Sequence, residues 1–278
     1  MKRHHEGHDE AEQERQPSKR ARAAASTKRT KAGKGRDQEP VANVLDVRNG
    51  THVNAGYMAP VTRRDFIEAH RVSGLEDSEV YYMARWITRD QAERWRKELD
   101  ELPQWYRPTL KVYGREIKQS RAIAAFSREA GLPLKYSGHE VEMHCPFPPL
   151  LDEIAKRLCT KEMLGEEVRF NHAMLNRYDD GSVYIGKHSD NLENQVIVTV
   201  SLGAERTFTF EEKKVKSTVD KARQSRKRSL VLESGSVLVM QGDVQKRFTH
   251  EIARESKKSP IYSQPRTSIT FRQLVYEK

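Results

Sequence analysis

His188 and Asp190 stand two residues apart, just before a β-rich run, in the stretch YIGKHSDNLENQVIVTVSLG. In an extended segment, residues i and i+2 point to the same side, so this spacing presents an imidazole and a carboxylate in one direction. The pair could supply two of the three protein ligands of a 2-His-1-carboxylate iron site. It could also be two polar residues of a surface loop, because His-x-Asp is a weak pattern on its own.

An iron site of this type needs a second histidine from another strand. His250 is a candidate because it follows an apolar strand and a Gly-Asp turn in MQGDVQKRFTHEIAR, so a return strand could bring it opposite His188 and Asp190. A half-buried histidine without a ligand role is the alternative for His250. Three other histidines have no partner two residues on, and the last of them is expected to be structural: His139, His144 and His172.

The final strand-like run, PRTSITFRQLV, carries an arginine at each end of one face. Its polar residues alternate with apolar ones and so share that face: Arg266, Ser268, Thr270 and Arg272. Two arginines turned into a jelly-roll interior need an anion there, because a buried unpaired guanidinium is unfavourable. Arginine binds carboxylates bidentately, so a small dicarboxylic acid would fit between them. Asn176 and Tyr178 share a face in NRY and could add neutral hydrogen bonds, whereas either arginine alone could be in a surface ion pair.

Helices are expected before these strands. Residues 87–105 predict a helix with Thr88 as N-cap and Pro103 as its stop, because their apolar residues recur at helical spacing. Residues 148–163 predict a second amphipathic helix, and residues 62–70 a short one.

From residue 168 onward the pattern changes to a period of two, in short runs separated by Gly and Asp. The runs are residues 168–178, 196–203, 206–212, 229–242 and 267–276. A basic segment, residues 213–228, interrupts them as a surface insertion. This pattern predicts a many-stranded antiparallel domain, either a double-sheet jelly roll or a barrel.

The composition indicates a globular domain with a region outside its core. The 278 residues suffice for one large domain or two small ones, but only 36% are hydrophobic and 32% are charged. No stretch approaches the apolar length of a membrane span, and the N-terminus lacks the apolar core of a secretory signal. Cys145 and Cys159 are the two cysteines and are expected to be reduced. The net charge of +10 favours a polyanionic partner, although a basic tail alone would also produce it.

The chain is expected to divide into three parts. Residues 1–40 read as a disordered basic tail, whose run SKRARAAASTKRTKAGKGR contains no acid. Such a run could be a nuclear-import signal or a nucleic-acid arm, and we expect a nuclear protein; a merely solubilising tail is the alternative. Residues 41–78 read as a partly ordered linker, and residues 79–278 as the folded domain.

Four segments together resemble the AlkB family of Fe(II)- and 2-oxoglutarate-dependent nucleic-acid demethylases: NRYDDGSVYIGKHSD, SLGAERTFTF, FTHEI and RTSITFR. The resemblance covers roughly residues 80–278. It implies a mainly β fold, with a double-stranded β-helix (jelly-roll) core, N-terminal flanking helices and a nucleotide-recognition lid. It also implies Fe(II) held by His188, Asp190 and His250, with 2-oxoglutarate and O2 as co-substrates.

The same resemblance assigns the polar strand residues to 2-oxoglutarate. Arg266 would hold the distal carboxylate, helped by Tyr178. Arg272 and Asn176 would lie near the carboxylate next to the keto group. Ser268 stands where the repair members commonly carry Asn, so one hydrogen bond to the co-substrate is expected to be weaker or replaced.

The upstream segment KVYGREIKQSRAIAAFS is similar to the duplex-probing hairpin and base lid of the DNA-repair branch. By that match, Tyr113 is an aromatic finger that fills the gap left by an extruded base, and Arg121 contacts DNA. Tyr136, in LKYSG, would stack on the damaged base. Basic residues interleaved with tyrosines also suit a protein that stacks bases and grips phosphates.

The resemblance implies oxidative demethylation of 1-methyladenine and 3-methylcytosine for DNA repair, with formaldehyde released. The expected partner is double-stranded DNA. The protein is expected to be a monomer, to act in the nucleus and not to bind a membrane. Two alternatives stay open. The first is an RNA or N6-methyladenine demethylase of the same family, and the second is a non-catalytic nucleic-acid-binding protein on this fold.

Overall fold

The computed structural model of this chain describes six segments: residues 62–112, 115–131, 135–136, 139–190, 196–214 and 225–274. The side chains of residues 110–112, 135–136 and 139–140 are not described. The basic tail, most of the expected linker and residues 215–224 of the basic insertion therefore lie outside the described residues. The division into tail, linker and domain stays a prediction.

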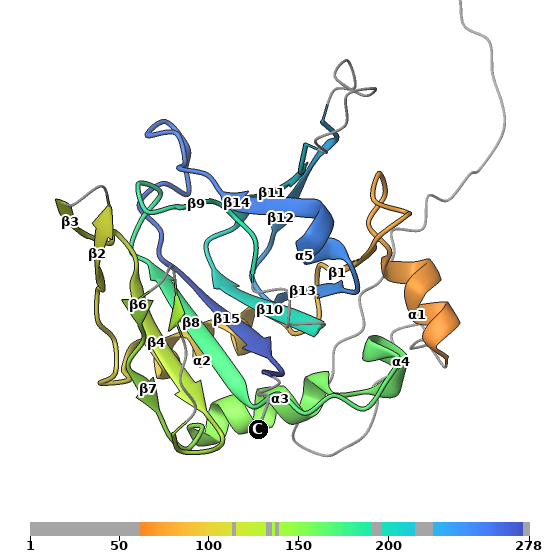
Figure 1. The fold of residues 1–278 in the computed structure, drawn as a ribbon, viewed down its shortest axis with the longest axis horizontal. Helices are drawn as coiled ribbons and strands as arrows, with labels where there is room; N and C mark the ends of the chain where they lie inside the picture. The colour runs from red at the N-terminus through yellow and green to blue at the C-terminus, as the bar shows by residue number, and fades with distance from the viewer. Residues whose placement is uncertain are drawn as a thin grey trace, which may run out of the picture. The chain divides into compact units, whose positions relative to one another are not determined.

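Two sheets face each other in the described part of the chain (Figure 1). The seven-stranded sheet has the order β1 (Glu79–Met83), β13 (Ser236–Gln241), β10 (Val196–Gly203), β15 (Arg266–Arg272), β8 (His172–Tyr178), β4 (Ala122–Ser127) and β7 (Met143–His144). The four-stranded sheet has the order β12 (Lys227–Leu232), β11 (Arg206–Glu212), β14 (Phe248–Ile252) and β9 (Ile185–His188). All these pairs are antiparallel except β4 with β7. The double-sheet jelly roll that the sequence predicts is confirmed.

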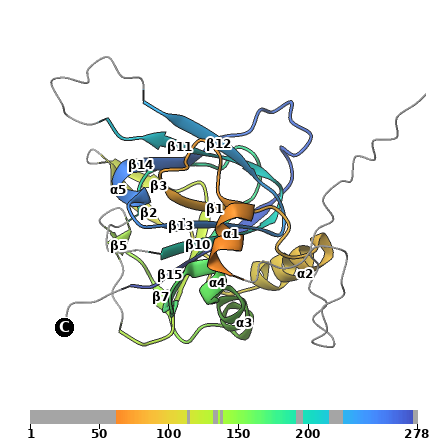
Figure 2. The same ribbon diagram turned by 90° about the vertical axis from the view of Figure 1, so that its right-hand side faces the viewer.

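The helices of the described segments are α1 (Arg63–His70), α2 (Arg89–Asp100), α3 (Pro149–Leu158), α4 (Lys161–Leu164) and α5 (Val244–Arg247). Four of them, α1 to α4, pack on the outer face of the large sheet, whereas the short helix α5 lies beside β14 of the small sheet (Figure 1, Figure 2). Thr88 caps α2 as predicted, because its side chain accepts a hydrogen bond from the Gln91 backbone N–H. None of the helices in the described segments is long and apolar enough to cross a membrane.

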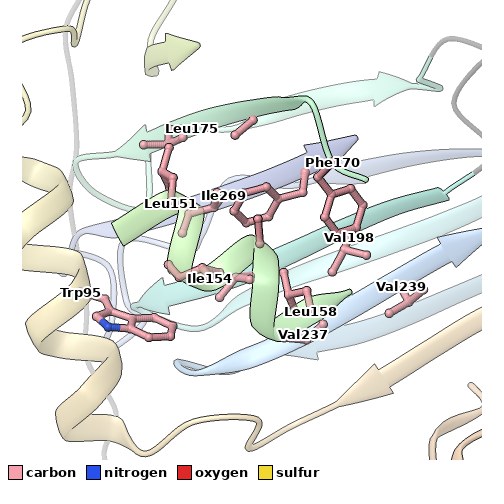
Figure 3. Packing of buried hydrophobic residues seen from close by; sticks show 14 of the residues in the cluster. Trp95, Leu151, Ile154, Leu158, Phe170, Leu175, Val198, Val237, Val239 and Ile269 are labelled. Carbon is pink, nitrogen blue, oxygen red and sulfur yellow. The ribbon is translucent and has the colours of Figure 1, made fainter. Parts of the chain in front are cut away.

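The main apolar core fills the space between α2, α3 and the large sheet (Figure 3). Trp95 of α2 and Ile154 of α3 pack there with Val198 and Ile269 of the central strands. Phe66 of α1 belongs to the same core, so the packed part of the chain includes residues before the expected boundary at 79. A second core lies between the two sheets and includes Ile197, Leu238, Phe208, Phe210 and Phe248.

The single helix predicted for residues 148–163 is wrong in one respect, because two helices occupy that range. Cys159 leaves the helical conformation at φ −82° and ψ 66°, and so ends α3. Thr160 then starts α4, because its side chain accepts from the Met163 N–H. The apolar spacing runs through both helices, so hydrophobic periodicity could not reveal the break. The helix predicted for residues 87–105 is also shorter than expected and ends at Asp100.

The inner face of the large sheet is polar at its centre. Ile269 and Phe271 of β15 point into the helix-covered core, so the alternating residues of β15 face the other sheet. Register then aligns the polar residues in rows. Ser268 lies between Asn176 of β8 and Ser201 of β10, and Arg266 lies opposite Tyr178. The strand order thus assembles one polar surface from three strands that are far apart in sequence.

Two short hairpins stand beside the sheets. One joins β2 (Thr109–Val112) to β3 (Arg115–Lys118), and the other joins β5 (Lys135–Tyr136) to β6 (His139–Glu140). All four residues of β3 are exposed, including Ile117 at 50%. The β2–β3 hairpin lies at one edge of the large sheet, beyond β4 (Figure 1).

Gly203 lets the end of β10 approach the start of β15. Its φ is +89°, and a Cβ at this position would lie 2.5 Å from the Pro265 carbonyl oxygen. We expect Gly203→Ala to lower the free energy of unfolding by about 3 kcal/mol or more, because backbone strain and a backbone clash add together. Gly131→Ala is the control, with φ +78° but no atom of the described, non-neighbouring residues within 4 Å of the added Cβ, and should lose only about 1–2 kcal/mol. Equal losses in urea unfolding would contradict the close approach.

Candidate active site

Two histidines face each other where β9 meets β14. His188 and His250 are directly opposite in the antiparallel pairing, and their ring centroids are 4.3 Å apart. The His250 ring also stacks on Phe208 at 5.2 Å, which fixes its plane. The Nδ1 atom of His188 lies 2.9 Å from the Gly186 carbonyl oxygen. Because a carbonyl can only accept, Nδ1 carries the proton and Nε2 keeps the lone pair that a metal would use.

Asp190 lies beside this pair, directly after β9. Its backbone N–H donates to the side chain of Gln245 at 2.9 Å, which holds the turn in place. One carboxylate oxygen is 3.6 Å from His250 Nε2, and the other accepts from Arg272 Nη2 at 2.5 Å. The structure therefore brings His188, Asp190 and His250 together, as the sequence led us to expect.

Burial and neighbouring charges together set the protonation of the three groups. Burial lowers the pKa of His250 to about 3, and the neighbouring His188 acts in the same direction. Burial also lowers the pKa of His188, although Asp190 opposes it. For Asp190 burial raises the pKa, but Arg272 and the two histidines outweigh it and hold the pKa at about 2. At neutral pH the group consists of two neutral imidazoles and one carboxylate, which is the form that binds a metal.

The donor set fits Fe(II), since two imidazoles and one carboxylate are the facial ligands of non-haem iron oxygenases. Within the described segments, no three His, Cys, Asp or Glu side chains already converge as tightly as the ligands of a bound metal. The Asp190 carboxylate is instead engaged by Arg272. The fit of this site to Fe(II) therefore rests on the types of donor atom and on the proximity of His188, Asp190 and His250.

Arg266 has the features of a buried anion site. It is fully buried, yet its Nε and Nη1 atoms have no hydrogen-bond partner among the described residues. Its Nη2 donates to Ser201 Oγ at 2.9 Å. Burial lowers the pKa of Arg266, Tyr178 opposes this, and nearby Arg206 reinforces it. A buried cation with unused donors fits one carboxylate of a dicarboxylic acid.

The other residues expected around the co-substrate line the same inner face. Tyr178 lies under the Arg266 guanidinium, 4.9 Å from it, and Asn176 lies opposite Ser268. Arg272 ends the row and donates to Asp190. It therefore connects the residues expected to bind 2-oxoglutarate with those expected to bind the metal. On β15, Ser268 and Thr270 stand between Arg266 and Arg272 in the same row.

Arg121, expected to contact DNA, points inward. It is only 4% exposed, and its Nε donates to Asn176 Oδ1 at 2.9 Å. It also lies near enough to help lower the pKa of His188. In this structure Arg121 is thus part of the inner site, and its contact with DNA stays a prediction.

Two expected substrate residues cannot be located. Tyr113 lies outside the described residues, between β2 and β3 in sequence. The backbone of Tyr136 belongs to β5, but its side chain is not described. The nucleotide-recognition lid therefore stays a prediction.

Two of the remaining histidine candidates, His144 and His172, do not join the site. His144 pairs with Glu142 at 3.8 Å on the far strand β7. His172 is fully buried opposite Arg272, with neither ring nitrogen bonded within the described segments, and burial lowers its pKa to about 3. The side chain of His139 is not described.

Sequence reasoning missed Arg206. This residue is 2% exposed and its guanidinium lies 5.5 Å from the Tyr178 ring. A signal was available, because Arg206 alternates with Phe208 and Phe210 in RTFTFEE and must share their inward face.

Comparisons with known proteins agree with this geometry. The 2OG-Fe(II) oxygenase superfamily profile matches residues 79–272. A protein from Arabidopsis thaliana named DNA oxidative demethylase ALKBH2 is 30% identical over 218 residues, which cover 70% of this chain and 66% of that protein. The Mus musculus protein of the same name is 29% identical over 203 residues, covering 68% and 77%. The chain thus spans just under two thirds of the plant relative.

A solved structure described as "The structure of OsALKBH1" aligns with a TM-score of 0.47 and 18% identity, over 70% of this chain and 98% of that one. This likeness is too distant to inform the site. The superfamily match implies Fe(II), 2-oxoglutarate and O2 as cofactor and co-substrates. The resemblance to the AlkB family is confirmed by the names of the relatives, and the chain belongs to the 2OG-Fe(II) oxygenase superfamily.

Proposed function

We propose that this chain is an oxidative demethylase of N-alkylated bases in DNA, with 1-methyladenine and 3-methylcytosine as substrates. The observation that carries this proposal is the inner face itself, where the polar row of β15 ends at Arg272, beside His188, Asp190 and His250, and begins at Arg266. The unused donors of Arg266 require an anion, such as an anionic co-substrate. This requirement argues against the alternative of a non-catalytic nucleic-acid-binding protein on this fold. The relatives named DNA oxidative demethylase favour DNA over other substrates.

Each part of the face has a separate role in this proposal. Arg266 and Tyr178 bind and orient the distal carboxylate of 2-oxoglutarate. Arg272 and Asn176 orient the other end, beside the three metal-binding side chains. Bound Fe(II) supplies the dioxygen chemistry, which converts 2-oxoglutarate to succinate and CO2 while one oxygen atom hydroxylates the methyl carbon. The hydroxymethyl group then leaves as formaldehyde, and the unmodified base is restored.

The surface beside the site suits a nucleic acid. A base inside a duplex cannot reach buried residues, so the enzyme must extrude it. The exposed strand β3 offers Arg115 and Lys118 for phosphates and Ile117 as an apolar wedge. We infer that double-stranded DNA is the partner, that a monomer binds it, and that the basic run within residues 1–40 directs the protein to the nucleus.

Mass spectrometry of methylated oligonucleotides incubated with the full chain, Fe(II) and 2-oxoglutarate tests the substrate. We expect loss of 14 mass units, one methylene in net terms, from strands with 1-methyladenine or 3-methylcytosine. A matched set should contain DNA and RNA, single and double strands, and N6-methyladenine. Turnover only of RNA or of N6-methyladenine would support the alternative substrates. Absence of both demethylation and 2-oxoglutarate decarboxylation would leave the non-catalytic binder.

Tyr113→Ala tests the inferred finger. If Tyr113 fills the gap left by an extruded base, it matters only in a duplex, because a single strand has no stack to repair. Base–aromatic stacking is worth about 1–3 kcal/mol, so we expect roughly tenfold or greater loss on methylated duplex DNA and little on the single strand. Tyr136→Ala is the comparison, since stacking on the extruded base should matter for both substrates. Equal losses on both substrates for Tyr113→Ala would refute the finger and favour single-stranded or RNA substrates.

A further inference from the structure

Arg206 binds together two loops that meet at the Arg266 end of the site. Its Nη2 donates to the Val183 carbonyl at 2.8 Å and to the Ala253 carbonyl at 2.6 Å. Its Nε lies 3.3 Å from a Glu255 carboxylate oxygen. Residues 179–184 follow β8 and residues 253–265 precede β15, and we call these two loops the strap. Since β8 ends at Tyr178 and β15 begins at Arg266, the strap lies next to both residues in the chain.

Gly181 closes the strap from the other side. Its N–H donates to the Tyr262 carbonyl at 2.6 Å, and its carbonyl accepts from the Glu255 N–H at 2.8 Å. A Cβ on Gly181 would lie 2.7 Å from the Glu255 Cβ and 2.7 Å from the Tyr262 ring. These contacts are below normal van der Waals separation, so only glycine permits the two loops to touch here.

Tyr178 connects the strap to the anion site. The guanidinium of Arg206 lies 5.5 Å from its ring, and that of Arg266 lies 4.9 Å from it. The two arginines differ in what they bond. Arg206 donates to loop carbonyls through Nη2 and forms an ion pair with Glu255 through Nε, whereas Arg266 has two donors without a partner among the described residues. Arg206 is therefore bonded to the protein, and Arg266 is left for a ligand.

We propose that Arg206 and Gly181 are positioning residues whose strap forms the end wall of the dicarboxylate site and sets the length of the acid that Arg266 accepts. This inference rests on the proposed function, in which 2-oxoglutarate occupies that site. By holding Tyr178 and covering Arg266, the strap excludes water, which strengthens the ion pair between Arg266 and a carboxylate. A fixed wall also excludes an acid longer by one methylene, because the carboxylate would have to move past Tyr178.

The test compares 2-oxoglutarate with 2-oxoadipate, which is one methylene longer. Calorimetry with Mn(II) in place of Fe(II) measures both dissociation constants on the full chain without turnover. The intact protein should favour 2-oxoglutarate by about tenfold or more, the usual effect of one methylene in a closed pocket. Arg206→Met and Gly181→Ala should both weaken 2-oxoglutarate binding about tenfold, while the preference over 2-oxoadipate falls toward one.

Gly181→Ala is included in case Arg206→Met fails to fold. It opens the strap without removing a buried charge. Arg226→Met is the matched control: Arg226 also joins separate segments, through Asp77 and Glu212, but lies outside the strap. It should lower stability without changing the preference between the two acids. The ratio of the two constants is insensitive to a partly unfolded sample, so a purely structural role would not alter it.

Three results would decide the matter. A lost preference in both strap variants, with the control unchanged, supports the end wall. An unchanged preference in folded Gly181→Ala overturns it, even though the intact protein binds 2-oxoglutarate tightly. Failure of the intact protein to bind either acid would overturn the proposed function and the end wall with it.

Discussion

His188→Ala should abolish demethylation while the protein stays folded. A facial site has no spare protein ligand, so losing one imidazole removes several kcal/mol of metal binding and a loss of about a thousandfold or more in activity is expected. His188 is only partly buried and, among the described residues, hydrogen-bonds to the Gly186 carbonyl alone, so its removal should disturb little of the fold. Mn(II) binding and demethylation are the two measurements.

The matched control is His144→Ala. That histidine is also partly buried, but it lies on β7 and contacts Glu142 and Phe126 rather than the site. Its loss should leave metal binding and turnover close to those of the intact chain. If His188→Ala retained both metal binding and activity, the metal would have to bind elsewhere.

Asp190→Ala should give the same loss of activity with a larger loss of stability. Asp190 is the partner of the Arg272 guanidinium, and removal leaves that buried charge without its carboxylate. Breaking such a pair typically destabilises a protein by about 3–5 kcal/mol. The two variants thus separate the loss of a ligand from the loss of an ion pair.

Much of the site was predictable from the sequence, because alternate residues of a strand point to the same side whichever strands lie beside it. His188 and Asp190 share a direction because they are two apart, and Arg266, Ser268 and Arg272 share a face for the same reason. Asn176 and Tyr178 could be assigned to one face of β8 by the same rule. These statements need no knowledge of which strands pair, which is why the sequence sufficed for them.

Pairing and register depend on long-range packing, and there the sequence was insufficient. That His250 lies opposite His188, rather than one residue away, depends on the irregular register between β14 and β9. From the family resemblance Arg121 was expected to contact DNA, whereas the pairing of β4 with β8 brings this residue, just before β4, to Asn176. The ion pair between Arg272 and Asp190 joins residues that are 82 positions apart, and no local pattern encodes it.

Arg266→Ala should raise the 2-oxoglutarate concentration needed for half-maximal activity about thirtyfold or more. Truncating one partner of a buried, hydrogen-bonded charge pair typically costs about 2–5 kcal/mol, and 2 kcal/mol corresponds to about thirtyfold. Arg266→Lys should also be impaired, since a point charge cannot reproduce the bidentate fork. Arg228→Ala is the control, because Arg228 of β12 donates a hydrogen bond to Ser73 and is not part of the polar row on β15, so half-saturation should be unchanged.

Arg266→Met separates binding from folding. In the ligand-free protein the buried guanidinium keeps two donors unused among the described residues, an arrangement that opposes stability. Replacing it with an apolar side chain of similar length should therefore leave the ligand-free Tm unchanged or higher. The same variant should lose the rise in Tm that 2-oxoglutarate produces in the intact chain, because stabilisation by a ligand requires binding to the folded state. A lower Tm without ligand, together with an undiminished response to 2-oxoglutarate, would mean that Arg266 supports the fold and that the dicarboxylate binds elsewhere.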